Sequence, residues 1–224
     1  MTRHRSTPKK DATPYWYKFI IPLIFLLMVV LTAGILNEHP SVPPMDDTYI
    51  QLVFGKSLIT SSPLSCNPGE PSSAFTSPLW LLPSAVASAG GTDIAPLLLM
   101  FFSFVCAVSI LFLLKPATGL LFILMGPYLF HASSGMETAL ACLFVVLIWQ
   151  SIYDDRYLRA RPWLLLCVFL SRPELAVIAI PLIILERGNG LRRLLIILLP
   201  SLVAGLLWIA WNLHASGFPL PTTF

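Results

Sequence analysis

Apolar residues gather in long runs along this chain, and short polar or proline-containing segments separate them. The six runs are Phe19–Leu36, Ile94–Leu114, Gly119–Phe130, Met136–Ile152, Pro162–Leu185 and Leu194–Leu213. A helix needs about 20 mainly apolar residues to cross the hydrocarbon core, and shorter helices are tolerated inside a bundle. The runs lack the alternation of barrel strands, and backbone groups in lipid must be satisfied within their own segment. The pattern therefore predicts an all-α, polytopic transmembrane helical bundle.

Composition supports a membrane protein. Of the 224 residues, 56% are hydrophobic and only 11% are charged, whereas soluble domains carry roughly 25% charged residues. Most of the surface is therefore expected to face membrane lipids, and no nucleic-acid partner is expected. The cysteines show no metal-ligand spacing and predict no disulfide framework, and His131 is expected to be an interfacial residue rather than a ligand.

Basic residues predict the orientation, because Lys and Arg concentrate on the cytoplasmic side. The clusters are Arg3 to Lys18, Lys115, Arg156 to Arg161 and Arg187 to Arg193. Placing all of them inside gives a cytoplasmic basic tail at 1–18, a first transmembrane helix at 19–36, an outer loop at 37–93, a helical bundle at 94–213 and an outer tail at 214–224. The protein is then expected in the plasma membrane with its N-terminus cytoplasmic and its C-terminus outside.

Two segments cannot be single membrane crossings in this orientation. Pro162–Leu185 is interrupted by SRPE, Ser171–Glu174, and we expect two half-length helices that turn around there, so that Arg187 returns to the inside. Pro78–Gly91 is too short for a crossing and contains Pro83, so we expect a helix that lies along the outer surface. The predicted topology therefore has about seven membrane-crossing helices, two of them half-length, plus this surface helix.

Four polar motifs share the outer side in this topology, namely MDD, SSGMET, SRPE and PLPTTF. Each also has a structural interpretation. Asp46 and Asp47 are consistent with a solvated turn, and Glu137 with a carboxylate at the positive end of a helix dipole. Arg172 and Glu174 are consistent with a structural ion pair at a membrane turn.

The order of these motifs resembles a known family. Asp46–Trp80, which begins DDTYI and ends SPLW, resembles the first outer loop of bacterial GT-C type membrane glycosyltransferases of the arabinofuranosyltransferase kind. SSGMETAL, Ser133–Leu140, resembles their SG-[LM]-ET helix start, and SRPE resembles their TRPE. GFPLPTTF, Gly217–Phe224, is similar to their G-x-x-x-PNTF. The resemblance extends over Phe19–Phe224.

The chain also departs from the family pattern. The arginine that usually follows DD is absent, with Val53 nearby, and Thr222 stands where the family has Asn. Members of the family continue with several more helices and usually a soluble outer domain. By this resemblance the chain is expected to be an N-terminal module, either a fragment of a longer protein or a shortened relative.

The resemblance implies a GT-C-like fold and a glycosyltransferase. Such enzymes move a sugar, here arabinofuranose at the family level, from a polyprenyl phosphate donor to a cell-envelope glycan acceptor on the outer side. It implies Asp46 and Asp47 as catalytic carboxylates, which accept a proton or hold a divalent cation. Adjacent carboxylates raise one another's proton affinity unless a cation or an arginine compensates, which is consistent with a cation at this pair.

The same resemblance implies substrate-binding residues on the other motifs. Arg172 is expected to pair with the donor phosphate, since guanidinium matches its geometry. Glu137 or Glu174 is expected to orient Arg172 or a sugar hydroxyl. Trp80 is a candidate for lining the sugar or lipid site, with packing as the other role.

A second class of function stays open at this point. The chain is also consistent with a non-catalytic or inactive membrane subunit of a cell-envelope complex, or with a transporter fragment. Transporters usually place polar groups near the bilayer midplane and show repeated halves. Here the charges collect at one interface and no repeat is visible, but the shortness of the chain favours a non-catalytic role.

Overall fold

The computed structural model describes residues 16–36, 43, 45–60, 64–67, 70–154, 157–186 and 190–221. Its elements are α1 (Tyr17–Leu36), α2 (Asp47–Leu58), β1 (Ser65–Asn67), β2 (Glu70–Pro71), the short 3-10 helix η1 (Pro78–Trp80), α3 (Leu81–Ala89), α4 (Ala95–Leu113), α5 (Pro116–Leu124), α6 (Gly126–Ser133), α7 (Thr138–Tyr153), α8 (Arg161–Ser171), the 3-10 helix η3 (Pro173–Ile178), α9 (Ala179–Glu186) and α10 (Leu191–Ser216). The predicted helical fold is confirmed, apart from the antiparallel β1–β2 hairpin.

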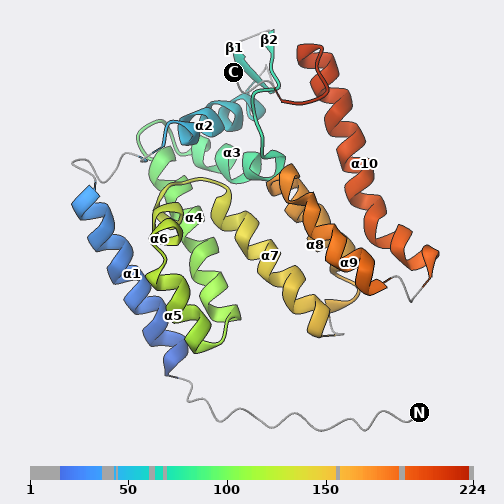
Figure 1. Cartoon of the computed structure of the whole chain (residues 1–224). Helices are drawn as coiled ribbons and strands as arrows, with labels where there is room; N and C mark the ends of the chain where they lie inside the picture. The colour runs from blue at the N-terminus through green and yellow to red at the C-terminus, as the bar shows by residue number, and fades with distance from the viewer. Residues whose placement is uncertain are drawn as a thin grey trace, which may run out of the picture.

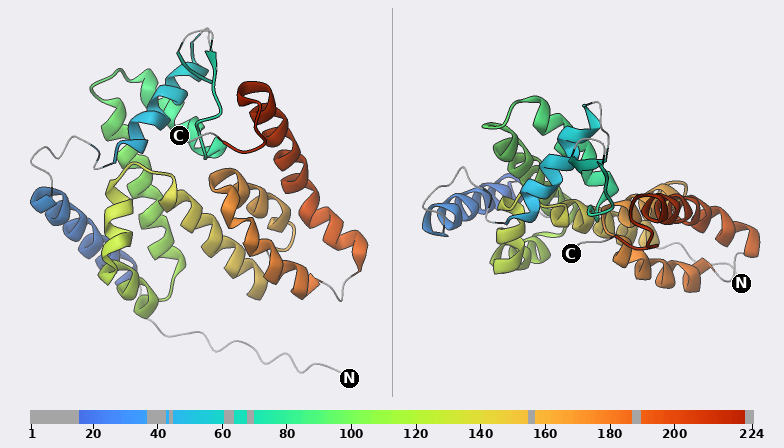
Figure 2. Two further views of the ribbon diagram at one scale, coloured as in Figure 1. Left: turned by 45° about the horizontal axis from the view of Figure 1, so that its top comes forward. Right: turned by 90° about the horizontal axis from the view of Figure 1, so that it is seen from above.

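The longer helices stand side by side, and a small layer closes one end of them. α2 and α3 form this end layer together with the hairpin, while α1 and α10 lie at opposite edges of the molecule (Figures 1 and 2). α2 crosses α3 closely because Gly55 has no side chain. A Cβ at Gly55 would lie 2.4 Å from the backbone carbon of Ser84. The end layer is therefore packed backbone against backbone.

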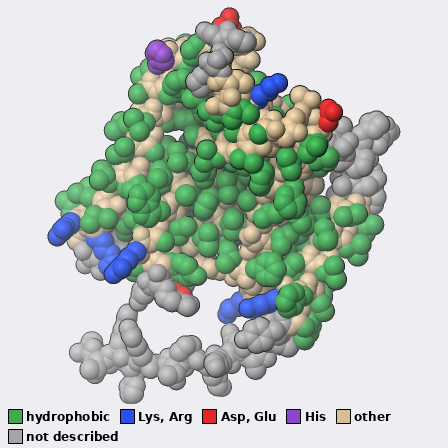
Figure 3. Space-filling view, turned by 180° about the vertical axis from the view of Figure 1, so that it is seen from behind, with side chains coloured by type: hydrophobic (Ala, Val, Ile, Leu, Met, Phe, Trp, Pro, Cys, Tyr) green, Lys and Arg blue, Asp and Glu red, His purple; other side chains and the backbone are tan. Residues whose placement is uncertain are grey.

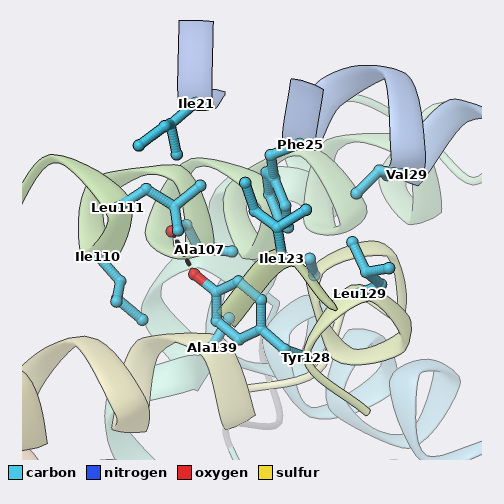
Figure 4. Packing of buried hydrophobic residues seen from close by; sticks show 11 residues of the cluster. Ile21, Phe25, Val29, Ala107, Ile110, Leu111, Ile123, Tyr128, Leu129 and Ala139 are labelled. Carbon is cyan, nitrogen blue, oxygen red and sulfur yellow. Dashed lines mark hydrogen bonds between the residues drawn. The ribbon is translucent and has the colours of Figure 1, made fainter. Parts of the chain in front are cut away.

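Two apolar clusters hold the helices together below this layer. In the first, Phe25 of α1 stacks on Phe104, and Tyr128 donates a 2.5 Å hydrogen bond to the carbonyl of Ala107 (Figure 4). The second joins α7, α8, α9 and α10 through Ile148, Leu165, Val168, Leu182 and Ile197. Burial of such side chains is the main force that fixes the helix arrangement.

Two helices among the described residues are long and apolar enough to cross a membrane, namely α4 and α10. α6 and α7 would make a third only if a pair bent by 119° were one span. At about 1.5 Å per residue, the 9 residues of α5 and the 8 of α9 are far shorter than a hydrocarbon core of roughly 30 Å. Membrane association is thus supported, but the expected bundle of about seven crossings is not confirmed.

Two expected segments can be compared directly with the structure. The helix expected over Gly119–Phe130 is wrong, because the chain breaks at Met125 between α5 and α6. Pro127 explains the break, since proline lacks an N–H and favours the first turn of a new helix. The interruption expected at SRPE is confirmed: α8 ends at Ser171, and α9 runs back beside α8 after η3 (Figure 1).

The segment expected as the first outer loop, residues 37–93, contains two α-helices among its described residues. A helix is found at Pro78–Gly91 as expected, but α2 was not anticipated. Several positions of the expected loop lie outside the described residues, including Pro68 and Gly69 of NPGE. Arg156, Arg187, residues 1–15 and Thr222–Phe224 also lie outside the described residues. The predictions that concern them stay predictions.

One face of the molecule shows a broad apolar surface. Hydrophobic side chains cover its middle, and most of the visible Lys and Arg side chains lie toward the edge away from α2 and α3 (Figure 3). Exposed leucines and isoleucines are especially dense on α10, where Leu199, Leu206 and Leu207 are all more than half exposed. A surface of this size is typical of proteins that contact lipid or other hydrophobic partners.

Candidate functional site

A tight turn between α6 and α7, residues 134–137, is the point where three of the sequence motifs meet. Gly135 has a φ of +75°, a left-handed conformation that favours glycine. The side chain of Ser103 in α4 supports the turn from below. Its hydroxyl donates to the carbonyls of His131 at 2.8 Å and Met136 at 3.2 Å.

The first motif reaches this turn through Thr48. Its fully buried hydroxyl donates a 2.8 Å hydrogen bond to the carbonyl of Ser134. Asp46 and Asp47 immediately precede Thr48, at the start of α2, and both side chains are exposed. The backbone carbonyl of Asp46 accepts from the amides of Tyr49 and Ile50. The aspartates are therefore held on a helix end beside the turn rather than in an irregular loop.

The end of the same Asp46–Trp80 stretch reaches the turn through Trp80. Its indole Nε1 donates a 3.0 Å hydrogen bond to the carbonyl of Gly135, and the side chain is only 1% exposed. The ring packs in an apolar cluster with Leu52, Leu99 and their neighbours. In this structure Trp80 therefore positions the turn, and its expected contact with sugar or lipid stays a prediction.

The SGMET and SRPE motifs meet as an ion-pair cluster. Arg172 lies in the extended link between α8 and η3, and its guanidinium contacts Glu137 at 2.8 Å and Glu174 at 3.0 Å. It also donates a 3.3 Å hydrogen bond to Thr138 Oγ1. Glu137 is 2% exposed, while Glu174 is 60% exposed. Both glutamates contact Arg172, and the expectation that one of them orients Arg172 or a sugar hydroxyl stays a prediction.

Burial of Glu137 has electrostatic consequences. Glu137 is the N-cap residue of α7, as expected for a carboxylate at the positive end of the helix dipole, although its side chain makes no capping hydrogen bond. Loss of hydration in this turn raises the pKa of Glu137, and the charge of Arg172 opposes that rise. The carboxylate depends on Arg172 for its stability as an anion.

Neither aspartate belongs to this ion-pair cluster. Arg172 pairs with Glu137 and Glu174, and no ion pair links it to Asp46 or Asp47, all five being described residues. The two aspartates are also poorly placed to share one cation by themselves, because neighbouring residues of a helix do not face each other.

The expected cation has limited support from side chains. In the described parts of the chain, no three His, Cys, Asp or Glu side chains come together as a metal site. Hard divalent cations take about six or more oxygen ligands. Asp46 and Asp47 alone do not supply such a set, so a cation at this place would need oxygens from a substrate phosphate and water. A divalent cofactor stays a prediction.

Among the described residues, two buried polar atoms of the Arg172–Glu137 ion pair have no hydrogen-bond partner, namely Oε2 of Glu137 and Nε of Arg172. Nδ1 of His131, near the end of α6, is also buried without a partner. Burial and, to a smaller extent, the charge of Arg172 lower the pKa of His131. Buried polar atoms are almost always satisfied in folded proteins, so the ion pair is a place where water or a ligand is expected.

Sequence reasoning missed one residue of this site, Thr48. It was passed over because the aspartates before it carry the obvious chemistry. The available signal was weak, since Thr48 is a small polar residue directly after DD. The expectation that His131 is interfacial stays a prediction.

An apolar groove of about 510 Å³ lies close to the end layer. Its walls come from α10, the η1–α3 segment and the end of α8, and include Phe75, Leu82, Leu170, Leu207, Trp208 and Trp211. Leu170 is only two positions before Arg172. The groove therefore places an apolar surface next to the polar end of α8.

Comparison with known proteins matched no protein family, no curated protein and no solved structure. The likeness to GT-C glycosyltransferases therefore rests on the four motifs alone.

Proposed function

We propose that this protein is an integral membrane glycosyltransferase, or part of one, that acts on the outer side of the plasma membrane. It would move a sugar, with arabinofuranose as the family-level candidate, from a polyprenyl phosphate donor to a cell-envelope glycan. One observation carries the proposal: motifs far apart in the chain meet at one turn. Thr48 bonds to Ser134 across 86 positions, and Trp80 bonds to Gly135 across 55.

The exposed aspartates supply the chemistry in this proposal. An acceptor hydroxyl attacks the anomeric carbon of the donor sugar, and the bond from that carbon to the phosphate oxygen breaks. The phosphate leaves with the bonding electrons, and the hydroxyl proton passes to Asp46, with Asp47 in support. A proton acceptor of this kind contributes typically 10²- to 10⁴-fold to rate. A divalent cation, when bound, would neutralise charge on the leaving phosphate.

The lipid part of the donor would pack against the apolar groove. The groove lies between α10, the η1–α3 segment and the end of α8, and Leu170 in its wall precedes Arg172 by two positions in the chain. A polyprenyl phosphate combines an apolar chain with a charged head, so it suits a surface where these two environments adjoin. The groove and the end layer lie on the same part of the molecule, since Leu58 of α2 and Leu81 of α3 also line it.

The proposed orientation follows from charge. Lys115 follows α4, Arg161 begins α8, and Arg192 lies at the start of α10. These positions are at the ends of helices away from the α2–α3 layer. The positive-inside rule then puts the end layer and its aspartates outside.

Reconstitution tests the proposal. Purified protein in lipid vesicles would be given a polyprenyl phosphate donor with a radiolabelled pentose or hexose, together with an arabinan or mannan acceptor. Transfer of label to the acceptor, absent from protein-free vesicles, is the expected result. Folded protein that transfers no label from either class of donor would contradict the proposal and favour a non-catalytic membrane subunit.

A further inference from the structure

A second groove, of about 370 Å³, lies where α2 meets the turn between α3 and α4. Tyr49, Leu52, Val53 and Lys56 of α2 form one wall, at the i, i+3, i+4 and i+7 spacing of a single helix face. The end of α3, the turn after it and the first residues of α4 form the other wall. We call this the Lys56 groove, because Lys56 is the one charged side chain among the described residues that line it.

Small residues on the second wall leave the space open. A Cβ at Gly91 would meet nothing within 4 Å. Ser88 donates its hydroxyl to the carbonyl of Leu52 at 3.1 Å, which ties the two walls together and satisfies both polar groups. The groove is therefore a mainly apolar surface that carries the single charge of Lys56.

The Lys56 groove lies at the end of a helix that can cross a membrane. α4 is long and apolar enough to do so, and its first residues, Ala95 and Pro96, line the groove. Tyr49 is 40% exposed and Val53 is 44% exposed. Tyrosine is enriched at the boundary between hydrocarbon and water, and lysine extends its ammonium toward the head groups there. Both the chains and the head groups of lipids therefore come within reach of this groove.

We propose that the Lys56 groove binds an anionic phospholipid, with part of one acyl chain against the apolar walls and the phosphate at Lys56. Such a lipid would hold α2 at the level of the head groups. The inference goes beyond the proposed function and does not depend on it, because it requires only that the first residues of α4 lie at the membrane surface.

Charge favours an anionic head group. Among the described residues, no carboxylate forms an ion pair with Lys56. The neighbouring Asp93 accepts a 3.3 Å hydrogen bond from Thr92 and does not line the groove. A lysine near the membrane surface attracts anionic lipids, whereas a zwitterionic head group would bring its own positive charge close to the ammonium.

A polyprenyl phosphate donor suits this groove less well than a phospholipid. Lys56 lies nine positions after Asp47 in the same helix, which corresponds to about 13 Å at roughly 1.5 Å per residue. A proton acceptor must lie within hydrogen-bond reach of the group that it deprotonates. A donor phosphate held at Lys56 would be too far along α2 for the proposed chemistry at Asp46 and Asp47, but a bound phospholipid has no such requirement.

Native mass spectrometry of the whole chain in detergent provides the test, because it counts bound lipids. The probes are dioleoyl phosphatidylglycerol, dioleoyl phosphatidylcholine and glycerol 3-phosphate. We expect tighter binding of phosphatidylglycerol than of phosphatidylcholine. Lys56→Gln should weaken phosphatidylglycerol binding about fivefold, the contribution of one basic residue at an anionic lipid surface, and should leave phosphatidylcholine binding unchanged.

Matched variants separate the charge from the groove. Lys56→Arg keeps the positive charge and should bind phosphatidylglycerol nearly as well as the unchanged protein. Val53→Trp puts a large ring into the groove and should weaken binding about tenfold, because the acyl chain loses apolar contact. Val86→Trp is the control, since Val86 is exposed on α3 and does not line the groove. Melting of each variant is followed in parallel, so that loss of folding is recognised.

Four results would overturn the inference. Equal binding of the two phospholipids would indicate an unselective apolar surface, and unchanged phosphatidylglycerol binding in Lys56→Gln or Val53→Trp would put the lipid elsewhere. Displacement of phosphatidylglycerol by glycerol 3-phosphate would indicate a site for free phosphate. Displacement by an equal concentration of a polyprenyl phosphate would assign the groove to the donor. No sugar transfer is measured here, so a failure of the proposed function would leave this lipid site in place.

Discussion

The hydroxyl of Thr48 donates a 2.8 Å hydrogen bond to the carbonyl of Ser134, and both groups are buried. This contact ties the helix that begins with Asp46 and Asp47 to the turn that carries Glu137. Trp80 bonds to the next carbonyl, that of Gly135. The placement of the aspartates therefore depends on contacts made by their neighbours.

Replacing Thr48 with Val should loosen this attachment. Valine keeps the branched shape but leaves the Ser134 carbonyl without its partner, which costs about 1–3 kcal/mol for a buried group. Thermal unfolding in detergent should show a lower midpoint. Thr92→Val is the matched control, because Thr92 is exposed, and an equal midpoint shift in both variants would contradict a special role for the Thr48 bond.

Gly135→Ala should damage the turn itself. The glycine has a φ of +75°, and a Cβ there would lie 2.9 Å from Cγ2 of Thr48. The left-handed backbone and the clash together should lower the free energy of unfolding by about 1–3 kcal/mol. Gly126→Ala is the control, since a Cβ at Gly126 meets nothing within 4 Å. The account of the turn would be wrong if the two variants unfolded alike.

The two glutamates beside Arg172 should differ in importance. Glu137→Ala removes a buried partner and should cost about 1–3 kcal/mol, because Arg172 keeps Glu174 and is partly exposed. Glu174→Ala removes an exposed partner and should cost about 0–1 kcal/mol. Denaturant unfolding of both variants would check the order. A larger loss of unfolding free energy in Glu174→Ala than in Glu137→Ala would contradict the view that the buried Arg172–Glu137 pair is the one that stabilises the fold.

Much of the helical architecture could be predicted from the sequence because long apolar runs have few alternatives. The cores of α4, α7 and α10 follow such runs directly. α2 was missed because its buried face includes polar residues, Thr48, Gln51 and Ser57, so no apolar stripe marks it. Met125 was missed as a break because the run around it stays apolar, while the proline two positions later starts a new helix.

The candidate site was predictable in its residues more than in its contacts. The motifs identified Glu137, Arg172 and Glu174, and the short spacing of the last two suggested their pairing. Glu137 lies between α6 and α7, whereas Arg172 follows α8. Their pairing therefore depends on how α7 packs against α8. The sequence pattern likewise gives no distance between Trp80 and Gly135. Only the three-dimensional arrangement brings these groups together.

The proposed orientation can be tested by cysteine labelling. In a protein whose four cysteines are replaced by serine, Thr92→Cys and Lys115→Cys give exposed sites at opposite ends of α4. An impermeant maleimide should label Thr92→Cys in intact spheroplasts and Lys115→Cys only after permeabilisation, because basic clusters favour the cytoplasmic side. The reverse pattern would show that the aspartates face the cytoplasm.

The most direct test of the glycosyl-transfer proposal is the effect of Asp46→Asn and Asp47→Asn on sugar transfer. The assay follows labelled sugar from a polyprenyl phosphate donor to a glycan acceptor, with protein amount and melting checked in parallel and Asp93→Asn as an exposed control. Loss of the proton acceptor predicts a fall of about 10²- to 10⁴-fold for Asp46→Asn, with folding intact because an exposed carboxylate contributes little to stability. Near-normal transfer by both variants at equal protein level would contradict the catalytic role and leave the pair as a solvated helix start.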